Sequence, residues 1–425
     1  MDTVIESVVC PGCSCLCDDL DVTLNDGGIV EVTNVCLWGA SKFFTTPKFH
    51  PQKERRRLLH PQVRRRGKAA EVAYETALGQ AAEILTRARR PLVYGLTNLG
   101  SRAQEAALKL AQSLKARLLP GDHALMAPYF RRLQQQGLYW APLEVIRDEA
   151  DTVLFWGVNP LHSAPRHVVR YAAFARGRFT ERGLEDRRVA AVDLYRNELA
   201  KFCHLFIKVA PDQELVLLQG LMEILFQGRK SATRVRGTRR LADLLARAGY
   251  GVIFFGRGVS YSRGPEILDG LAELTACLGA RTPFVLFPLS GDFNAAGLYH
   301  LLLRELGSAE APDFATAAGK GVGAKAVDFS DADALLVAGA DLFWFLSEEQ
   351  REDLQRRQVP IVALSPFANH TTVKAQVILP VALAGVEAAD VAYRLDGLPL
   401  GLKKLLPAAC PSDYQVLRDL QLFFQ

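Results

Sequence analysis

The sequence predicts an α/β protein in which a small cysteine-bearing N-terminal domain precedes two similar α/β units. Three observations predict this organisation. Five of the eight cysteines come before residue 37. From about residue 70, short apolar runs alternate with helix-length runs, which is typical of parallel sheets covered by helices. The same order of runs recurs 160 to 182 residues later. We therefore expect domains at 1–60, 61–245 and 246–425.

Composition narrows the class of protein. The chain has 425 residues, of which 49% are hydrophobic and 23% charged, as in a folded globular protein of two or three domains. A net charge of +5 gives no case for nucleic acid as the main partner. No apolar run reaches the roughly 18 residues of a membrane helix. The N-terminus lacks the pattern of a secretory signal. We expect a cytoplasmic protein, and in the reducing cytoplasm its cysteines are better interpreted as metal ligands than as disulfides.

The first domain is predicted to contain a hairpin. Two β-rich runs, 20–24 and 29–33, are joined by the turn sequence Asn-Asp-Gly-Gly. Cys17 precedes this hairpin and Cys36 follows it, so the hairpin returns Cys36 to the earlier cysteines. The basic stretch 53–67 then holds seven Lys or Arg and one Glu. It is interpreted as a solvated linker, with an anion-binding or partner-binding stripe as the alternative.

The two α/β units are predicted to be Rossmann-like, with matching elements. The first has strands at 91–98, 151–160, 187–197 and 204–211 and helices at 101–116 and 212–228. The second has a strand and helix within 251–279 and strands at 333–343, 359–367 and 375–383. Ligands of such sheets bind at the carboxyl ends of the strands, where Gly95, Gly157, Gly256 and Gly339 lie.

The cysteine cluster, defined as Cys10, Cys13, Cys17 and Cys36, has the spacing Cys-x2-Cys-x3-Cys-x18-Cys. Three thiolates in one loop and a distant fourth suit a 4Fe-4S cluster. Zinc ribbons use two Cys-x2-Cys knuckles, and the second is missing here. Zinc and structural or degenerate cysteines remain the alternatives. Cys15 is not expected to be a ligand. The other three cysteines are interpreted as small buried hydrophobes: Cys203, Cys277 and Cys410.

A dense polar group follows the strand at 151–160. Asn159, Arg166 and His167 are its candidate ligand-binding residues, because arginine suits bidentate phosphate binding. The alternative is that the group hydrogen-bonds its own loop or faces a partner subunit. The complete group is Asn159, Pro160, His162, Arg166, His167 and Arg170.

Several stretches together resemble the molybdopterin-dependent oxidoreductases of the formate dehydrogenase type, and more closely the B subunit of formylmethanofuran dehydrogenase. They are "CPGCSCLCDDL" with "NVC", "WGVNPLHSAPRHVVRY" (156–171), "GVIFFGRG" (251–258), "PLSGDFNAAG" (288–297) and "GVEAADVAYRLDGLP" (385–399). The resemblance covers essentially the whole chain. It implies a bis-pterin guanine dinucleotide carrying molybdenum or tungsten between the two α/β units, an electron-transferring cluster, and a C-terminal barrel supplied by a separate subunit.

The sequence departs from that family at three positions. Active members ligate the metal with a cysteine or selenocysteine in the loop after the first strand. Here the loop reads "GLTNLGSRAQ", with Ser101 at the expected place, and no cysteine occurs between Cys36 and Cys203. We interpret Ser101 as the N-cap of the helix that follows. Trp38 stands where a basic residue is usual, and Asp292 stands where active relatives carry a histidine.

These departures favour a bacterial relative that does no redox chemistry. The chain resembles the B subunit of the formyltransferase/hydrolase complex, which takes formyl-tetrahydromethanopterin to formate. The expected partners are a zinc amidohydrolase-like A subunit and the C and D subunits. The metallopterin is expected to be lost, and this chain is expected to have no active site of its own. The alternative is an active molybdenum or tungsten subunit that interconverts carbon dioxide and formate, with Ser101 or another residue as the metal ligand.

No Ser-His-Asp spacing, Walker loop or HExxH motif is present. The last group singled out is predicted to be one salt-linked structural group: Glu387, Asp390, Arg394 and Asp396.

Overall fold

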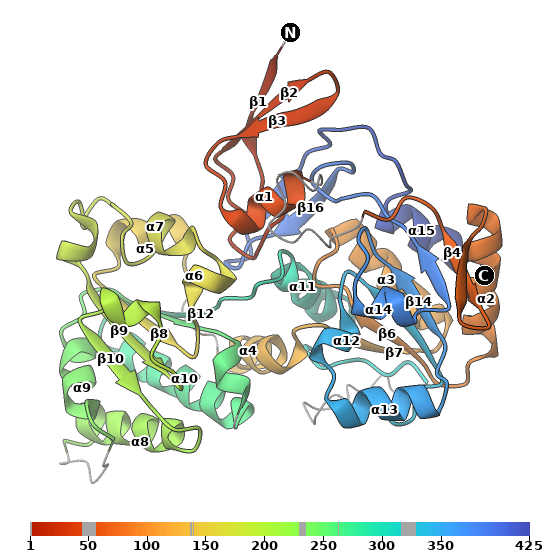
Figure 1. The fold of residues 1–425 in the computed structure, drawn as a ribbon. Coiled ribbons are helices and arrows are strands. Elements are labelled where there is room, and N and C mark those ends of the chain that lie inside the picture. Colours follow the sequence, from red (N-terminus) through yellow and green to blue (C-terminus); the bar gives the residue numbers. More distant parts are fainter. Residues whose placement is uncertain are drawn as a thin grey trace. The chain divides into compact units, whose positions relative to one another are not determined.

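The computed structural model describes residues 2–44, 57–136, 138, 140–228, 235–261, 263–315 and 329–425. The chain forms two compact units. Unit 1 comprises residues 1–123 and 292–425, and unit 2 comprises residues 124–291. Each unit contains a largely parallel sheet with helices on its faces (Figure 1). The predicted α/β class is therefore confirmed.

Unit 2 contains a five-stranded, wholly parallel sheet in the order β10-β9-β8-β11-β12. Strands β8, β11 and β12 are short apolar runs that are buried on both faces, as is typical of parallel sheets covered by helices. The elements are α4 (His123–Gln136), α5 (Leu143–Glu149), β8 (Thr152–Trp156), α6 (Pro160–Ser163), α7 (His167–Arg170), β9 (Arg188–Asp193), β10 (Leu205–Lys208), α8 (Gln213–Phe226), α9 (Thr238–Ala246), β11 (Gly251–Phe255), α10 (Gly264–Gly279) and β12 (Phe284–Pro288).

Unit 1 contains a seven-stranded sheet in the order β5-β4-β15-β14-β13-β6-β7. Strands β15, β14, β13, β6 and β7 are parallel, and β4 and β5 add an antiparallel edge. The elements are β4 (Gln62–Arg65), β5 (Lys68–Glu71), α2 (Tyr74–Arg87), β6 (Pro91–Gly95), α3 (Ser101–Ser113), β7 (Arg117–Pro120), α11 (Ala295–Leu306), β13 (Ala334–Ala338), α12 (Leu342–Phe345), α13 (Glu348–Arg356), β14 (Ile361–Leu364), α14 (His370–Lys374), β15 (Val377–Leu379) and α15 (Asp413–Gln421).

The sheets do not follow the predicted boundary at 245/246. The repeat of elements is present, with β6 to β10 of the first repeat matching β11 to β15 of the second. When each strand is replaced by its counterpart, the unit 2 order β10-β9-β8-β11-β12 becomes β15-β14-β13-β6-β7, which is the order in unit 1. However, β6 pairs with β13 and β8 pairs with β11, so each sheet joins the first two strands of one repeat to the last three of the other. The sequence of a strand that is apolar on both faces does not indicate which other strand pairs with it. The exchange is therefore invisible in the sequence.

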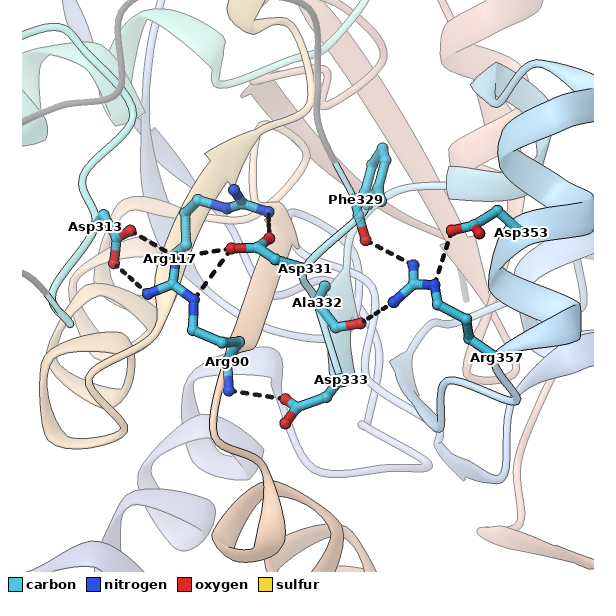
Figure 2. Close-up of polar contacts among 9 residues, drawn as sticks. All are labelled: Arg90, Arg117, Asp313, Phe329, Asp331, Ala332, Asp333, Asp353 and Arg357. Atoms are coloured by element: carbon cyan, nitrogen blue, oxygen red, sulfur yellow. Dashed lines mark hydrogen bonds and ion pairs between the residues drawn. The ribbon is translucent and has the colours of Figure 1, made fainter.

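A network of ion pairs ties the two repeats together at the amino-terminal edge of the unit 1 sheet (Figure 2). Arg90, which precedes β6, lies 2.9 Å from carboxylate oxygens of both Asp313 and Asp331. Arg117 of β7 lies 2.9 Å from Asp331. The carboxylate of Asp333 accepts the backbone N–H of Arg90 at 2.8 Å. Segments more than 220 residues apart along the chain are thereby joined where β6 and β13 begin.

The cysteine-bearing segment forms the predicted hairpin and adds a strand to it. Strands β1 (Thr3–Val8), β2 (Leu20–Asn25) and β3 (Gly28–Val32) make an antiparallel sheet, followed by α1 (Leu37–Phe43). Asp26 and Gly27 both have positive φ, as a two-residue hairpin turn requires. The segment belongs to unit 1, where Val9 and Leu16 share a core cluster with Phe293. That cluster also contains residues of the hairpin β16 (Asp390–Tyr393) and β17 (Pro399–Leu402).

The basic stretch 53–67 is not simply a solvated linker. Its first four residues, 53–56, lie outside the described residues. Arg57 is nearly buried, pairs with Glu387 at 2.5 Å and donates to the carbonyls of Pro366 and Val381. Residues 62–65 form β4 of the unit 1 sheet. The prediction was wrong here because arginine stems pack along apolar surface while their guanidinium groups satisfy buried carbonyls.

Candidate functional site

The cysteine cluster lies in a tight turn between β1 and β2. The N–H of Cys10 donates to the carbonyl of Cys17 at 2.8 Å, and Leu16, with a positive φ of 38°, closes an inner turn onto Cys13. Cys10, Cys13 and Cys17 are buried. A Cβ on Gly39 would stand 2.8 Å from Sγ of Cys10 and 4.0 Å from Sγ of Cys36. The hairpin therefore returns Cys36 to the cluster, as predicted.

The thiols share one enclosed environment and influence one another. Burial, and then the neighbouring thiols of Cys17, Cys13 and Cys36, hold the pKa of Cys10 well above its usual value. The pKa of Cys13 is lowered, first by a hydrogen bond from the Cys15 thiol and also by the positive charge of Lys42. Thiolates bind metals, so a bound cation would relieve the mutual repulsion of these sulfurs. Cys15 acts here as a hydrogen-bonding neighbour of Cys13.

Four cysteine thiols are a donor set that both iron–sulfur clusters and zinc ions use. In the described part of the chain, no three His, Cys, Asp or Glu side chains converge as ligands of one metal ion do. An iron–sulfur cluster distributes its thiolates over several irons. A Cβ on Gly39 has no space beside Sγ of Cys10, and a Cβ on Gly12 would make a tight contact of 3.1 Å with the same sulfur.

The three remaining cysteines lie elsewhere. Cys203 and Cys277 are in unit 2. Burial raises the pKa of Cys203 to about 12, which keeps it a thiol. The thiol of Cys410 is buried and donates to the carbonyl of Leu59 at 3.5 Å.

The loop after β6 carries Ser101, and its geometry corrects the predicted N-cap. Gly100 is the N-cap of α3, Ser101 is the first helical residue, and no side chain of the cap makes the capping bond. Instead, the carboxylate of Asp390 from β16 accepts the N–H of Arg102 at 3.1 Å. A Cβ on Gly100 would lie 2.2 Å from that carboxylate, so only glycine fits. The cap is thus supplied by tertiary contact.

Asn294 occupies the centre of this junction and has no exposed surface. Its side-chain amide donates to the carbonyl of Leu99 at 2.9 Å and to Oγ of Ser101 at 3.2 Å. Its Oδ1 accepts the N–H of Tyr393 at 2.8 Å, and its backbone carbonyl accepts from Gln104 at 3.0 Å. The Ser101 hydroxyl therefore accepts a hydrogen bond from a buried amide.

Asp292 closes the same loop from the other side. Its carboxylate accepts the hydroxyl of Thr97 at 2.8 Å and the side-chain amide of Asn98 at 2.9 Å. Asn98 also donates to the carbonyl of Gly339 after β13. A negative charge is thereby fixed at the carboxyl ends of β6 and β13, where ligands of parallel sheets bind. This charge would oppose an anionic cofactor there.

Sequence reasoning singled out Ser101 and Asp292 separately and missed Gln104, which belongs to the same junction. Gln104 has no exposed surface, although it is a polar residue within an otherwise alanine- and leucine-rich face of α3. That interruption of the apolar face was the available signal.

The polar group after β8 is only partly placed for ligand binding. Asn159 is the N-cap of α6, where its Oδ1 accepts the N–H of Leu161, and its amide donates to Glu198 at 2.6 Å. Arg166 is half-buried and precedes α7. His167 has no exposed surface, and its ring stands edge-on to Phe254 at 4.3 Å. The predicted ligand role of His167 is therefore not met by its position in the core.

The residues predicted to form one salt-linked group instead form three ion pairs. Arg394 and Asp396 form a fully buried bidentate pair, with distances of 2.8 and 2.6 Å. Glu387 pairs with Arg57, and Asp390 faces Arg102. Charges close in sequence diverge here because they lie on different segments: Glu387 precedes β16, Asp390 begins β16, and Arg394 and Asp396 lie in the turn between β16 and β17.

Comparison with known proteins identifies relatives along the full chain. The B subunit of tungsten-containing formylmethanofuran dehydrogenase 2 from Methanocaldococcus jannaschii is 31% identical over 437 residues, covering 99% of this chain and 98% of the relative. The protein of the same name from Methanococcus maripaludis is 29% identical, with 98% of each chain covered. No protein-family model matches the chain.

Two solved structures share the fold. One is the formyltransferase/hydrolase complex (FhcABCD) from Methylorubrum extorquens in complex with methylofuran. It matches with a TM-score of 0.66 and 19% identity, over 86% of this chain and 98% of that chain. The other is acetylene hydratase from Pelobacter acetylenicus, with a TM-score of 0.67 and 12% identity, over 99% of this chain and 69% of that chain. Among the described residues, none of the helices could cross a membrane.

Proposed function

Because the chain belongs to the family of formylmethanofuran dehydrogenase B subunits, we propose that it is a non-redox scaffold subunit of a formyltransferase/hydrolase complex. Such a complex converts formyl-tetrahydromethanopterin to formate in one-carbon metabolism. The chain would act in the cytoplasm, beside a zinc amidohydrolase-like A subunit and the C and D subunits, and would have no active site of its own.

The observation that carries the proposal is the closed junction at Ser101. The resemblance implies a metal-ligating cysteine or selenocysteine in this loop, and no cysteine lies between Cys36 and Cys203. The Ser101 hydroxyl, at the position expected for that ligand, accepts a hydrogen bond from the buried side-chain amide of Asn294. Asp292 adds a fixed negative charge close by. These residues do not fit a metallopterin, so we assign no chemistry to one.

The cysteine cluster, by contrast, fits a retained 4Fe-4S cluster. Cys10, Cys13, Cys17 and Cys36 would ligate it, and when bound it would supply stabilisation of the fold rather than electron transfer. A group that binds only the folded state stabilises that state. The core cluster that contains both Leu16 and Phe293 would transmit this stabilisation to the Ser101 junction.

A second function is favoured by one finding. The two curated relatives at 31% and 29% identity are both called tungsten-containing. The alternative is therefore an active subunit that interconverts carbon dioxide and formate on tungsten or molybdenum, with a ligand other than cysteine.

Metal analysis of the complex, purified without oxygen, separates the two functions. Iron, molybdenum, tungsten and zinc are counted per copy of this chain. We expect about four iron atoms and no molybdenum or tungsten. A variant in which Cys36 and Cys17 are both replaced by serine should lose the iron, whereas the matched Cys203→Ser variant should keep it. Molybdenum or tungsten near one atom per chain would overturn the scaffold function.

A further inference from the structure

Three large apolar side chains gather on two short helices of unit 1. Trp344 and Phe345 of α12 are 65% and 54% exposed, and Val373 of α14 is 61% exposed. The Trp344 ring lies 5.3 Å from the ring of His370. His370 and Val373 are three residues apart on α14 and so share one face of it. We call Trp344, Phe345 and Val373 the aromatic platform.

The platform is rigidly built. The carboxylate of Asp341, just before α12, accepts the N–H groups of His370 and Thr371 at the start of α14 and the Thr371 hydroxyl at 2.8 Å. The N–H of Phe343 donates to the same hydroxyl at 3.2 Å. Beneath the platform, Leu342 and Phe343 are buried in the unit 1 core. Binding at this surface would therefore cost little ordering of the backbone.

Single exposed apolar side chains are ordinary, but adjacent ones of this size on a rigid support mark an interaction surface. Tryptophan and phenylalanine are enriched at the centres of protein interfaces, where truncation of an anchor costs most of the binding energy. The side chains of the platform offer no charged group of their own. The platform thus suits an apolar side chain of another protein.

The border of the platform is charged in a way that selects the partner. Glu348 and Glu349, both exposed, form the first turn of α13 directly after α12. Lys374 is exposed at the other end, beside Val373. An apolar anchor flanked by a basic residue on the α13 side would complement both the platform and its acidic border.

We propose that the aromatic platform is a docking site for a neighbouring subunit of the complex, which presents an apolar side chain flanked by Lys or Arg. This inference rests on the proposed function, because that function supplies the partner subunits. It adds the surface of this chain that binds one of them.

Co-expression of this chain with the other subunits tests the docking site. The wild type, Trp344→Ser and a control, Phe423→Ser, are purified through this chain, and the retained subunits are counted by native mass spectrometry at serial dilutions. Phe423 is 54% exposed on the C-terminal turn of unit 1 and lies outside the platform. We expect Trp344→Ser to weaken retention of one subunit about tenfold or more, while Phe423→Ser retains all subunits.

A charge-reversal variant, Glu348→Lys with Glu349→Lys, should weaken retention of the same subunit at low salt and less so at high salt. Circular dichroism and the melting temperature confirm that each variant is folded. Full retention of every subunit by Trp344→Ser would overturn the docking site and leave the proposed function standing. Purification of the wild type without any other subunit would overturn both. Loss of a second copy of this chain, rather than of another subunit, would overturn the proposed partner.

Discussion

His167 is enclosed by aromatic side chains of unit 2, and its ring has lost contact with water. Burial lowers its pKa to about 3, and among the described residues neither ring nitrogen has a hydrogen-bond partner. The unfolded chain would protonate this histidine near its ordinary pKa of about 6.5. Folding therefore becomes less favourable as the pH falls from about 6.5 towards 3, because only the unfolded state gains the proton.

Replacing His167 by phenylalanine should remove that pH dependence. The aromatic edge against Phe254 is kept, while the unsatisfied nitrogens and the proton uptake of the unfolded state are removed. Between pH 7 and pH 5 the wild type should lose about 2 kcal/mol of its free energy of unfolding through this residue, and His167→Phe should not. Urea denaturation at both pH values measures this. The exposed control, His60→Phe, should keep the wild-type slope; an equal slope in all three proteins would contradict the assignment.

At the scale of elements, the start of α3 depends on residues almost 200 and 300 positions further along the chain. Asn294 satisfies Leu99, Ser101, Gln104 and Tyr393 at once, and Asp390 caps the helix. Buried polar groups that lose such partners are costly because water does not replace them. The junction therefore stabilises unit 1 and, in the same contacts, occupies the Ser101 hydroxyl.

Truncating Asn294 to alanine should destabilise the protein by about 3 kcal/mol, since several buried partners lose their hydrogen bonds together. Asn98→Ala is the matched control, because the Asn98 side chain also makes three hydrogen bonds but is only half-buried, so water can replace lost partners; it should cost about 1 kcal/mol. Chemical denaturation of the two variants measures both values. A cost for Asn294→Ala no greater than that for Asn98→Ala would show that the junction does not depend on this amide.

At the scale of the whole molecule, the exchange of strands between repeats makes unit 1 discontinuous and unit 2 continuous along the chain. The five strands of the unit 2 sheet all lie within residues 124–291, together with the helices that cover them. The fragment 246–425 contains strands of both sheets but completes neither. Unit 2 thus has its own core, whereas the second sequence repeat does not.

Residues 124–291 expressed alone should therefore fold and unfold cooperatively, and residues 246–425 should not. Strands left without their neighbours in the sheet would expose unpaired backbone groups and apolar faces. Thermal unfolding followed by circular dichroism compares the fragments. Cooperative unfolding of 246–425, with no transition in 124–291, would mean that the sequence repeats, rather than the observed units, are the folding units.

Much of this protein is determined by local sequence. The positions of the strands and helices, the hairpin that returns Cys36 to Cys10, and the repeat of elements follow from periodicity, turn chemistry and cysteine spacing, which act over a few residues. The resemblance to the B subunit of formylmethanofuran dehydrogenase could likewise be recognised from the sequence.

Only the tertiary structure decided three other features. It paired β6 with β13, so that the repeats exchange strands; it capped α3 with Asp390 instead of Ser101; and it buried His167 against Phe254. Each depends on groups that are far apart in sequence and meet only after the sheets form. A polar side chain has the same local pattern whether it faces a ligand, a helix end or a core, and the neighbours supplied by the fold decide which.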